Sequence, residues 1–314
     1  MRIVITGSSG QIGTNLGLRC LEQGHQVLGV DRRVNIWTDK IETVRADLAQ
    51  LPSASPGMLG GVDIGKPDVV VHLAAHAKVH ELVRHPGLAL ENTVMTHNVL
   101  EYCRHWRVPV IFSSSREVYG DIHRFDTEER NADFAYTEST YSASKIAGEA
   151  MVYAYARCYQ VPYLVFRFSN VYGRFDSDLQ RMERVIPLFI SRIARDEPIV
   201  VFGAGKVLDF TYVDDCVDGV MTGLERLVSG RVRDQTINLA CGVGHTLTEM
   251  AQYVGEALGR TPHITLAPSQ VGEVTRYVAN LDRARALLDF SPKVQLRDGV
   301  HRAVAWNLAW RSTH

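Results

Sequence analysis

The sequence has few cysteines and no metal-binding or disulfide pattern among them. The five cysteines of the 314-residue chain are scattered singly. An odd number without a C-x-x-C pair argues against a disulfide framework and against a zinc site. The twelve histidines form no H-E-x-x-H arrangement. We therefore expect no bound metal ion, and we interpret the cysteines as small buried residues.

Long apolar runs and an excess of one charge sign are also missing. No window approaches the ~18 apolar residues of a membrane-spanning helix, and Met1 leads directly into an apolar segment. We expect a cytoplasmic protein with no signal peptide and no membrane partner. Lys and Arg total 34 against 35 Asp and Glu, a formal net charge of -1, which argues against nucleic acid as a main partner.

The first 31 residues have the pattern of a strand, a glycine-rich turn, a helix and a second strand. The apolar run of residues 3–5 is continuous, as in a strand buried on both faces of a parallel sheet. Gly7, Gly10 and Gly13 follow at a spacing that lets the backbone bend sharply and approach a pyrophosphate at the start of the next helix. With a helix over residues 11–23 and a strand over 26–30, this segment predicts a dinucleotide-binding unit.

Asp31 stands at the end of the second predicted strand, ~20 residues after the glycines, where a carboxylate can accept hydrogen bonds from the adenosine ribose. The same carboxylate would repel a 2′-phosphate, so the sequence favours NAD over NADP. Arg32 and Arg33 leave the alternative open, because an arginine here can pair with that phosphate.

Further apolar segments predict the next strands of the same sheet, over residues 42–46, 68–75 and 108–112. Asp47 follows the first of them and either reaches the adenine or simply ends the strand. The last one delivers Ser113, Ser114 and Ser115 toward the ligand crevice of a doubly wound sheet.

Two residues in the following helical segment suggest acid–base chemistry. Tyr141 and Lys145 are four residues apart, so they share one face of a helix. An ammonium group beside a phenol lowers the phenol pKa, and the phenol can then act as an acid or base near neutral pH. The polar residues 121–140 before them are expected to form a loop over the crevice.

The regular alternation of strand and helix ends after a sixth strand at residues 161–169. We expect an α/β fold with a Rossmann-type doubly wound parallel sheet over residues 1–170 and a smaller C-terminal α/β substrate domain over residues 171–314. A strand near residues 236–240 is a candidate to return to the first sheet. The later pattern predicts helices over residues 185–194, 214–227, 248–258 and 297–311 and strands over 198–202 and 210–213.

These motifs, in this order, resemble the extended short-chain dehydrogenase/reductase family, in its nucleotide-sugar epimerase/dehydratase branch with UDP-glucose 4-epimerase-like members. The resemblance covers nearly the whole chain. It implies NAD as a recycled cofactor, a nucleotide-diphosphate sugar as substrate and a homodimer through residues 85–106. The matching motifs are TGSSGQIG at 6–13, RADL at 45–48, HLAAH at 72–76, SSSREVYG at 113–120, YSASK at 141–145, RFSNVYG at 167–173 and DFTYVDDCVDG at 209–219.

By this resemblance Tyr141 is the acid/base, Lys145 lowers its pKa and holds the nicotinamide ribose, and Ser115 hydrogen-bonds the sugar O4. The residues implied to bind the cofactor are Gly7, Gly10, Gln11, Ile12, Gly13, Asp31, Arg32, Asp47, Leu48, Leu73, Ala74, Ala75, Ser113, Tyr141, Lys145 and Phe168. Those implied to bind the substrate are Ser115, Arg116, Asn170, Val201, Phe202 and Arg276.

The chain departs from the family pattern at three places. Leu208 stands where an arginine usually grips the diphosphate, and Asn280 replaces an aspartate. Glu117 stands at a position that is small or hydroxylated in simple 4-epimerases and a glutamate in dehydratases and decarboxylases. Arg116, however, replaces the aspartate that most 4,6-dehydratases place beside that glutamate.

We therefore predict an NAD-dependent nucleotide-sugar 4-epimerase that oxidises C4 transiently to a 4-keto intermediate and reduces it again. The alternative is a dehydratase or decarboxylase that uses Glu117 as a base, although Glu117 can also be a purely structural carboxylate. A dehydrogenase with net NADH production and a non-catalytic NAD-binding sensor are further hypotheses. A sensor has no need to keep Ser115, Tyr141 and Lys145 together.

Overall fold

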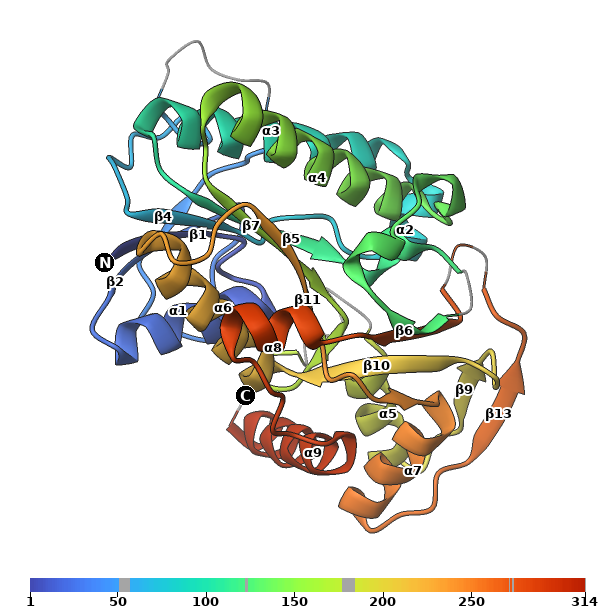
Figure 1. Ribbon diagram of the computed structural model, residues 1–314. Helices are drawn as coiled ribbons and strands as arrows, with labels where there is room; N and C mark the ends of the chain where they lie inside the picture. Colours follow the sequence, from blue (N-terminus) through green and yellow to red (C-terminus); the bar gives the residue numbers. More distant parts are fainter. Residues whose placement is uncertain (51–56, 122–123, 177–183, 271, 273, 314) are drawn as a thin grey trace.

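The largest element of the fold is a seven-stranded parallel sheet. The computed structural model describes residues 1–50, 57–121, 124–176, 184–270, 272 and 274–313 (Figure 1). The strands of the large sheet lie in the order β11-β7-β5-β4-β1-β2-β3. Their bounds are β1 (Arg2–Thr6), β2 (Gln26–Asp31), β3 (Thr43–Arg45), β4 (Val69–His72), β5 (Val110–Ser115), β7 (Tyr163–Phe168) and β11 (Gln235–Leu239).

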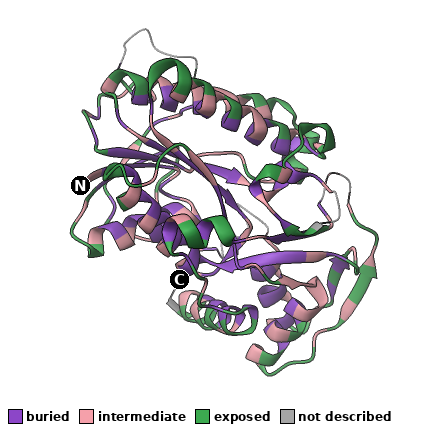
Figure 2. Cartoon of the chain, viewed as in Figure 1, coloured by how far each residue is buried: buried purple, intermediate pink, exposed green. Residues whose placement is uncertain are grey.

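Helices cover both faces of this sheet (Figure 1). One face packs on α1 (Gln11–Glu22) and α6 (Val213–Val228), the other on α3 (Gly87–Trp106) and α4 (Thr140–Tyr159). In β1, Ile3 and Ile5 belong to the first core and Val4 to the second, and all three are fully buried. Figure 2 shows the strands of the sheet buried between helices whose outer faces are exposed. The prediction of a doubly wound Rossmann-type α/β fold is confirmed.

The rest of the chain builds smaller sheets beside the first. One has the order β12-β10-β14-β6, with β8 also paired to β10, and another pairs β13 with β9. A third apolar core packs α5, α7 and α9 against these strands. The bounds are β6 (Arg124–Thr127), β8 (Asn170–Tyr172), β9 (Ile199–Phe202), β10 (Val207–Tyr212), β12 (Gly244–His245), β13 (Ile264–Ala267), β14 (Arg276–Ala279), α2 (Val79–Arg84), α5 (Val185–Ala194), α7 (Leu247–Leu258), α8 (Asp282–Leu288) and α9 (Leu296–Thr313).

Two details of the sequence interpretation are wrong. Residues 121–140 are not only a loop, because they contain β6 and two 3-10 helices, η2 (Glu129–Asn131) and η3 (Phe134–Tyr136). β6 pairs with β14 from far along the chain, a contact that no local pattern announces. Cys158 is exposed, unlike the other four cysteines.

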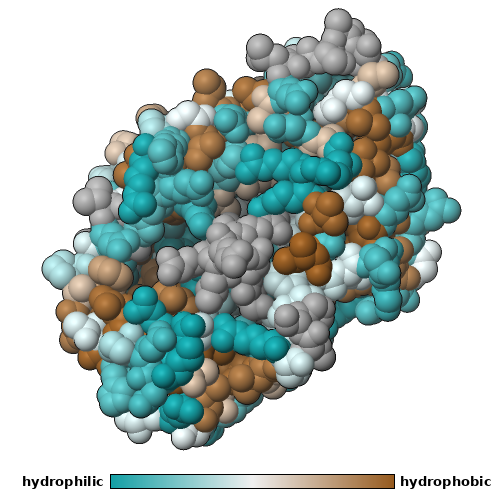
Figure 3. Space-filling model, turned by 180° about the vertical axis from the view of Figure 1, so that it is seen from behind, coloured by the Kyte–Doolittle hydropathy of each residue, from teal (hydrophilic) through white to brown (hydrophobic). Residues whose placement is uncertain are grey.

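The division of the chain at residue 170 stays a proposal. In that division the second part contributes β11 to the large sheet, where it pairs with β7. None of the helices in the described part of the chain combines the length and apolar character needed to cross a bilayer. Outside its grey regions, the face in Figure 3 mixes hydrophilic and hydrophobic residues.

Candidate active site

A cleft of about 1190 Å³ runs along the carboxyl ends of the large sheet and is closed on its other side by residues of α5, β9 and β10. From the middle of the sheet, strand order runs β1, β2, β3 toward one edge and β4, β5, β7, β11 toward the other. The cleft therefore lies where the direction of strand order reverses, which is where open α/β sheets bind their ligands.

The glycine turn after β1 forms one end of the cleft. Gly7 has φ +74°, and a Cβ atom there would lie 2.7 Å from the backbone nitrogen of Ala74. A Cβ on Gly13 would collide with the Gly7 carbonyl oxygen. Helix α1 begins after Gly10 with no side-chain cap within the described residues, so its first N–H groups remain for a ligand at Gln11 and Ile12, which line the cleft. This cradle fits the pyrophosphate of a dinucleotide.

Asp31 lines the same cleft and is almost fully buried. Its carboxylate accepts hydrogen bonds from the backbone N–H groups of Ser9, at 3.1 Å, and Arg33, at 2.9 Å. These bonds fix the orientation of the carboxylate at the end of β2. Arg32 is exposed and also borders the cleft.

The predicted cofactor residues all line this cleft. They come from the glycine turn and from the ends of several strands, and their binding roles stay proposals. They are Gly7, Gly10, Gln11, Ile12, Gly13, Asp31, Arg32, Asp47, Leu48, Leu73, Ala74, Ala75, Ser113, Tyr141, Lys145 and Phe168.

The catalytic candidates meet where β5 ends and α4 begins. The Ser139 hydroxyl accepts the Ser142 N–H, at 3.1 Å, and the Ser142 hydroxyl accepts the Ser139 N–H, at 3.0 Å, which starts α4 just before Tyr141. One turn later, the Lys145 Nζ donates to the Ser113 carbonyl oxygen at 2.8 Å and lies 5.8 Å from the centre of the Tyr141 ring.

The electrostatics of Tyr141 differ from the sequence-based expectation. Burial, followed by the nearby Glu117 charge, raises the pKa of Tyr141 to about 12, against the lowering effects of a Ser115 hydrogen bond and the charges of Arg184 and Arg116. Burial lowers the pKa of Lys145 to about 8, while the Glu149 charge raises it. The expectation that Lys145 lowers the pKa of the phenol is wrong, because burial dominates and the ammonium is directed to a carbonyl oxygen.

Arg116 and Glu117 form a buried ion pair beside Tyr141, with Nη2 and Oε1 2.9 Å apart. Arg116 also donates from Nε to the Asn170 side-chain oxygen at 3.3 Å. The Ser115 hydroxyl accepts the Glu117 N–H at 3.2 Å, which starts the 3-10 helix η1 (Arg116–Tyr119). Ser115, Arg116, Glu117 and Asn170 all line the cleft, so the polar end of β5 faces the candidate substrate region.

Two predicted substrate residues need correction. Val201 is buried in the third core, whereas its neighbours Val200 and Phe202 line the cleft. Successive side chains of a strand point to opposite faces, so two adjacent residues of β9 cannot both line the cleft. Arg276 lies outside the cleft lining, exposed at the start of β14, with Cζ 5.6 Å from the centre of the Phe125 ring.

The sequence interpretation missed Arg184 and Asp176. Arg184 donates to the Gln11 side-chain oxygen at 2.5 Å and to the Val171 carbonyl oxygen at 3.2 Å, and its Nε lies 3.2 Å from Asp176. Arg184 thus links the start of α1 to β8. Burial raises the pKa of Asp176 to about 7, against the lowering effect of Arg184. No local pattern marks either residue.

Lys206 was also missed. It is 4% exposed and lines the cleft together with Leu208 and Phe210. Residues at i, i+2 and i+4 share one face of a strand, so Lys206 brings a cation to the face on which Leu208 lies. Lys206 could have been predicted from the sequence, because Leu208 replaces the usual arginine and Lys206 lies two residues before it.

The chain resembles known proteins in sequence and in fold. A sequence profile of the NAD dependent epimerase/dehydratase family matches residues 3–240. The chain is 30% identical to a UDP-glucose 4-epimerase of Mycolicibacterium smegmatis, over 97% of each protein. It is 29% identical to a probable UDP-glucuronate 4-epimerase of Rhizobium meliloti, over 98% of this chain and 96% of that protein. The crystal structure of a UDP-glucose 4-epimerase with UDP-glucose from Thermotoga maritima superposes with a TM-score of 0.87 at 26% identity, over 100% of this chain and 99% of the other. These matches confirm the family resemblance and the prediction of NAD as the cofactor, and the chain belongs to the NAD dependent epimerase/dehydratase family.

Proposed function

We propose that the protein is a nucleotide-sugar 4-epimerase that oxidises C4 of the sugar and reduces the 4-keto intermediate from the other face. The observation that carries this proposal is the meeting of Ser115, Tyr141 and Lys145 at the junction between the glycine-turn part of the cleft and its substrate side. The two relatives named as 4-epimerases support the proposal, because they match this chain along almost its full length.

Each of the three residues has a role in a reversible proton transfer at O4. Ser115 already hydrogen-bonds Tyr141, so its hydroxyl is in place to share the sugar O4 with the phenol. Tyr141, as phenolate, removes the O4 proton while hydride leaves C4, and returns that proton when the ketone is reduced. Oxidised NAD, bound along the glycine turn, would supply the hydride acceptor and a positive charge. The charges of Arg184 and Arg116 lower the pKa of Tyr141 and so favour the phenolate, and Lys145 places its ammonium 5.8 Å from the centre of the phenol ring.

The substrate side suits a diphosphate-linked sugar. The cations Arg116, Arg184 and Lys206 all border it, and Phe202 adds an apolar wall. We propose a UDP-hexose or UDP-hexuronate, since the two named relatives act on UDP-glucose or, by their name, UDP-glucuronate.

A lyase is the second candidate, and the position of Glu117 favours it. Glu117 is buried in the cleft close enough to Tyr141 to raise the phenol pKa, and Arg116 pairs with its carboxylate. A carboxylate held ionised near a 4-keto sugar can remove the C5 proton, which the adjacent ketone acidifies. The same pair also fits a structural role, because it links η1 to Asn170.

The deciding experiment incubates the purified protein and NAD separately with UDP-glucose, UDP-galactose, UDP-glucuronate and UDP-galacturonate and identifies the products by NMR. We expect interconversion of one pair that differs only at C4. Loss of water or of carbon dioxide from the sugar would favour the lyase, whereas accumulation of NADH equal to the substrate consumed would make the protein a dehydrogenase.

A cytoplasmic homodimer stays a prediction. The side chain of Leu90 on α3 is 68% exposed, so a partner subunit could bury it at an interface. Light scattering of the purified protein tests the dimer, and a mass near the 35.0 kDa of one chain would refute it.

A further inference from the structure

Behind the cleft, a buried carboxylate ties the helix of Tyr141 and Lys145 to the central strands. Glu149 lies one turn after Lys145 on α4 and is 5% exposed. Its carboxylate accepts hydrogen bonds from the Ser114 hydroxyl at 2.5 Å, and from the Nε and Nη2 of Arg167 at 2.8 and 2.6 Å. The Tyr153 hydroxyl donates to it as well, at 2.9 Å. Both carboxylate oxygens are therefore fully engaged inside the protein.

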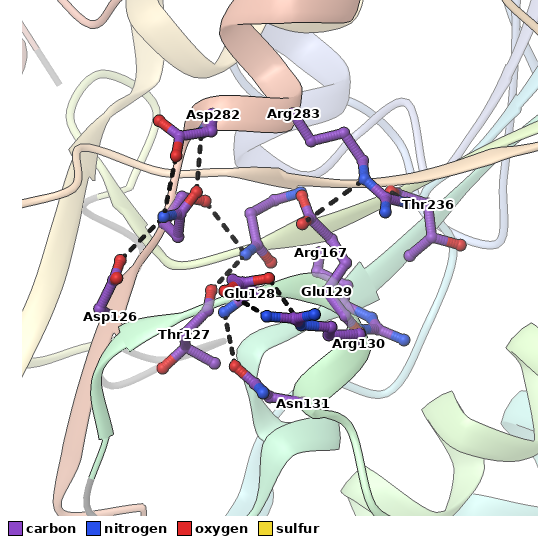
Figure 4. A network of polar contacts seen from close by, with 12 residues as sticks. Asp126, Thr127, Glu128, Glu129, Arg130, Asn131, Arg167, Thr236, Asp282 and Arg283 are labelled. Atoms are coloured by element: carbon purple, nitrogen blue, oxygen red, sulfur yellow. Dashed lines mark hydrogen bonds and ion pairs between the residues drawn. The ribbon is translucent and has the colours of Figure 1, made fainter.

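Arg167, on β7, extends this contact to η1 and η2. Its Nη1 donates to the Tyr119 hydroxyl at 3.1 Å and to the Glu129 carbonyl oxygen at 2.7 Å. The Tyr119 hydroxyl donates to the side-chain oxygen of Asn238 at 2.5 Å, and the Asn238 N–H donates to the Glu129 carboxylate at 2.8 Å. Figure 4 shows the outer end of this network, where Arg167 and Glu129 lie together and Arg283 approaches from α8. The pair of Glu149 and Arg167 thus contacts β5, η1 and η2.

The groups that this network holds are neighbours of the catalytic candidates. Ser114 stands between Ser113, whose carbonyl oxygen receives the Lys145 hydrogen bond, and Ser115, which hydrogen-bonds Tyr141. Tyr119 ends the 3-10 helix that begins with Arg116 and Glu117. A shift of Glu149 or Arg167 would therefore move both sides of the reacting centre.

We propose that Glu149 and Arg167 form a positioning pair that fixes the end of β5, η1 and the Lys145 ammonium relative to one another. This inference rests on the proposed function only in that Lys145 takes part in the reaction. The pair costs free energy to bury, since each ion loses its water, and its mutual hydrogen bonds offset that cost only while both partners remain. Removing one charge leaves the other buried without its counter-ion.

The charge of Glu149 acts directly on Lys145. The groups that face the Lys145 ammonium are Tyr141 and Glu149 on α4, the Phe112 ring and Ser113 carbonyl oxygen on β5, and His72 on β4. His72 is neutral at ordinary pH, because burial and the charge of Lys145 lower its pKa to about 3. Glu149 is thus the carboxylate that keeps the ammonium protonated against burial, and a purely structural hydrogen-bonding role would not require its charge.

The test is a pH titration of Lys145 by NMR in the full-length protein with 13C in its lysines. The lysines Lys40, Lys66, Lys78, Lys145, Lys206 and Lys293 are few enough to resolve, and the Lys145→Arg variant assigns the signal. We expect a midpoint near pH 8 in the unaltered protein. Glu149→Gln should lower that midpoint by about one pH unit or more.

Two further variants separate charge from packing. Tyr153→Phe removes a hydrogen bond to Glu149 but no charge, and it should leave the midpoint unchanged. Glu149→Gln with Arg167→Met avoids an unpaired buried arginine, so it keeps the test open if the single variant does not fold, and its midpoint should still be lowered. An unchanged midpoint in the double variant, or an equal shift with Tyr153→Phe, would overturn the inference. Because the titration needs no substrate, a lowered midpoint without epimerase activity would refute the proposed function alone.

Discussion

The Lys145 ammonium donates its hydrogen bond to the Ser113 carbonyl oxygen, at 2.8 Å, and stands 5.8 Å from the centre of the Tyr141 ring. The ammonium therefore contacts the Ser113 carbonyl oxygen and not the phenol. It also ties α4 to the end of β5, so one side chain fixes the distance between the two elements that carry the catalytic candidates.

The burial of this ammonium should cost stability in a way that depends on pH. The folded-state pKa of about 8 lies below the ordinary lysine value of 10.5, so the unfolded chain binds more protons between these two values. The contribution of Lys145 to stability therefore rises as the pH increases from about 8 to 10.5, and its cost is complete below pH 8. Lys145→Met should raise the free energy of unfolding at pH 7 by about 1–3 kcal/mol in urea titrations. Lys293→Met, at an exposed lysine, is the control and should change it little. A lower free energy of unfolding in Lys145→Met would contradict this prediction, because it would show that burial of the ammonium does not destabilise the fold.

Cofactor choice should depend on Asp31. Calorimetry should give tighter binding of NAD than of NADP, because the carboxylate can accept from both ribose hydroxyls and would meet a 2′-phosphate with like charge. Asp31→Ser should reduce the difference in affinity between NAD and NADP, whereas Arg33→Ala should increase that difference or leave it unchanged. Equal affinities of the unaltered protein for the two cofactors would mean that Arg32 or Arg33 governs the choice.

Tyr141→Phe should leave folding and NAD binding nearly unchanged and reduce turnover by a factor on the order of 10² to 10⁴. The loss should appear in kcat, since the phenol acts in the reacting step. The matched control is Tyr153→Phe, on the same helix but behind the cleft, which should keep most of the activity. Near-normal turnover in Tyr141→Phe would rule out the proposed proton transfer.

Lys206 should supply charge to the diphosphate that Leu208 cannot. Lys206→Gln should weaken the binding of UDP by about 1.5–3 kcal/mol, as for a hydrogen bond to a charged group. Adding Leu208→Arg in that background should restore affinity, because both residues lie on one face of the cleft. Arg276→Ala, outside the cleft, should have a small effect. Calorimetry measures all three variants, and a strong loss in Arg276→Ala with none in Lys206→Gln would move the diphosphate elsewhere.

The local motifs of the site were predictable from the sequence. Gly7 and Gly13 must lack side chains for the turn to pack on Ala74 and on its own backbone. The spacing of these glycines in the sequence predicts this requirement. Tyr141 and Lys145 share a helix face for a similar reason, since four residues make about one turn.

The parts of the site assembled from distant segments were not predictable in this way. Arg184 reaches Gln11 and Asp176 through folding of the whole chain, and nothing in its neighbours marks it. Val201 was predicted to line the cleft but points to the other face of β9, because a shift of one residue along a strand reverses the face to which a side chain points. The pKa of Tyr141 depends on burial by many segments, so the four-residue spacing to Lys145 could not give it.

The most direct measurement runs the reaction in deuterium oxide with NAD and UDP-glucose or UDP-glucuronate, followed by NMR of the sugar. Transient oxidation moves only hydride between C4 and the nicotinamide, so the product should be inverted at C4 and carry no carbon-bound deuterium. Glu117→Gln should then preserve this pattern, although its rate can fall with the loss of the pair with Arg116. Deuterium at C5 or C6 that disappears in Glu117→Gln would instead identify a lyase that uses Glu117 as its base.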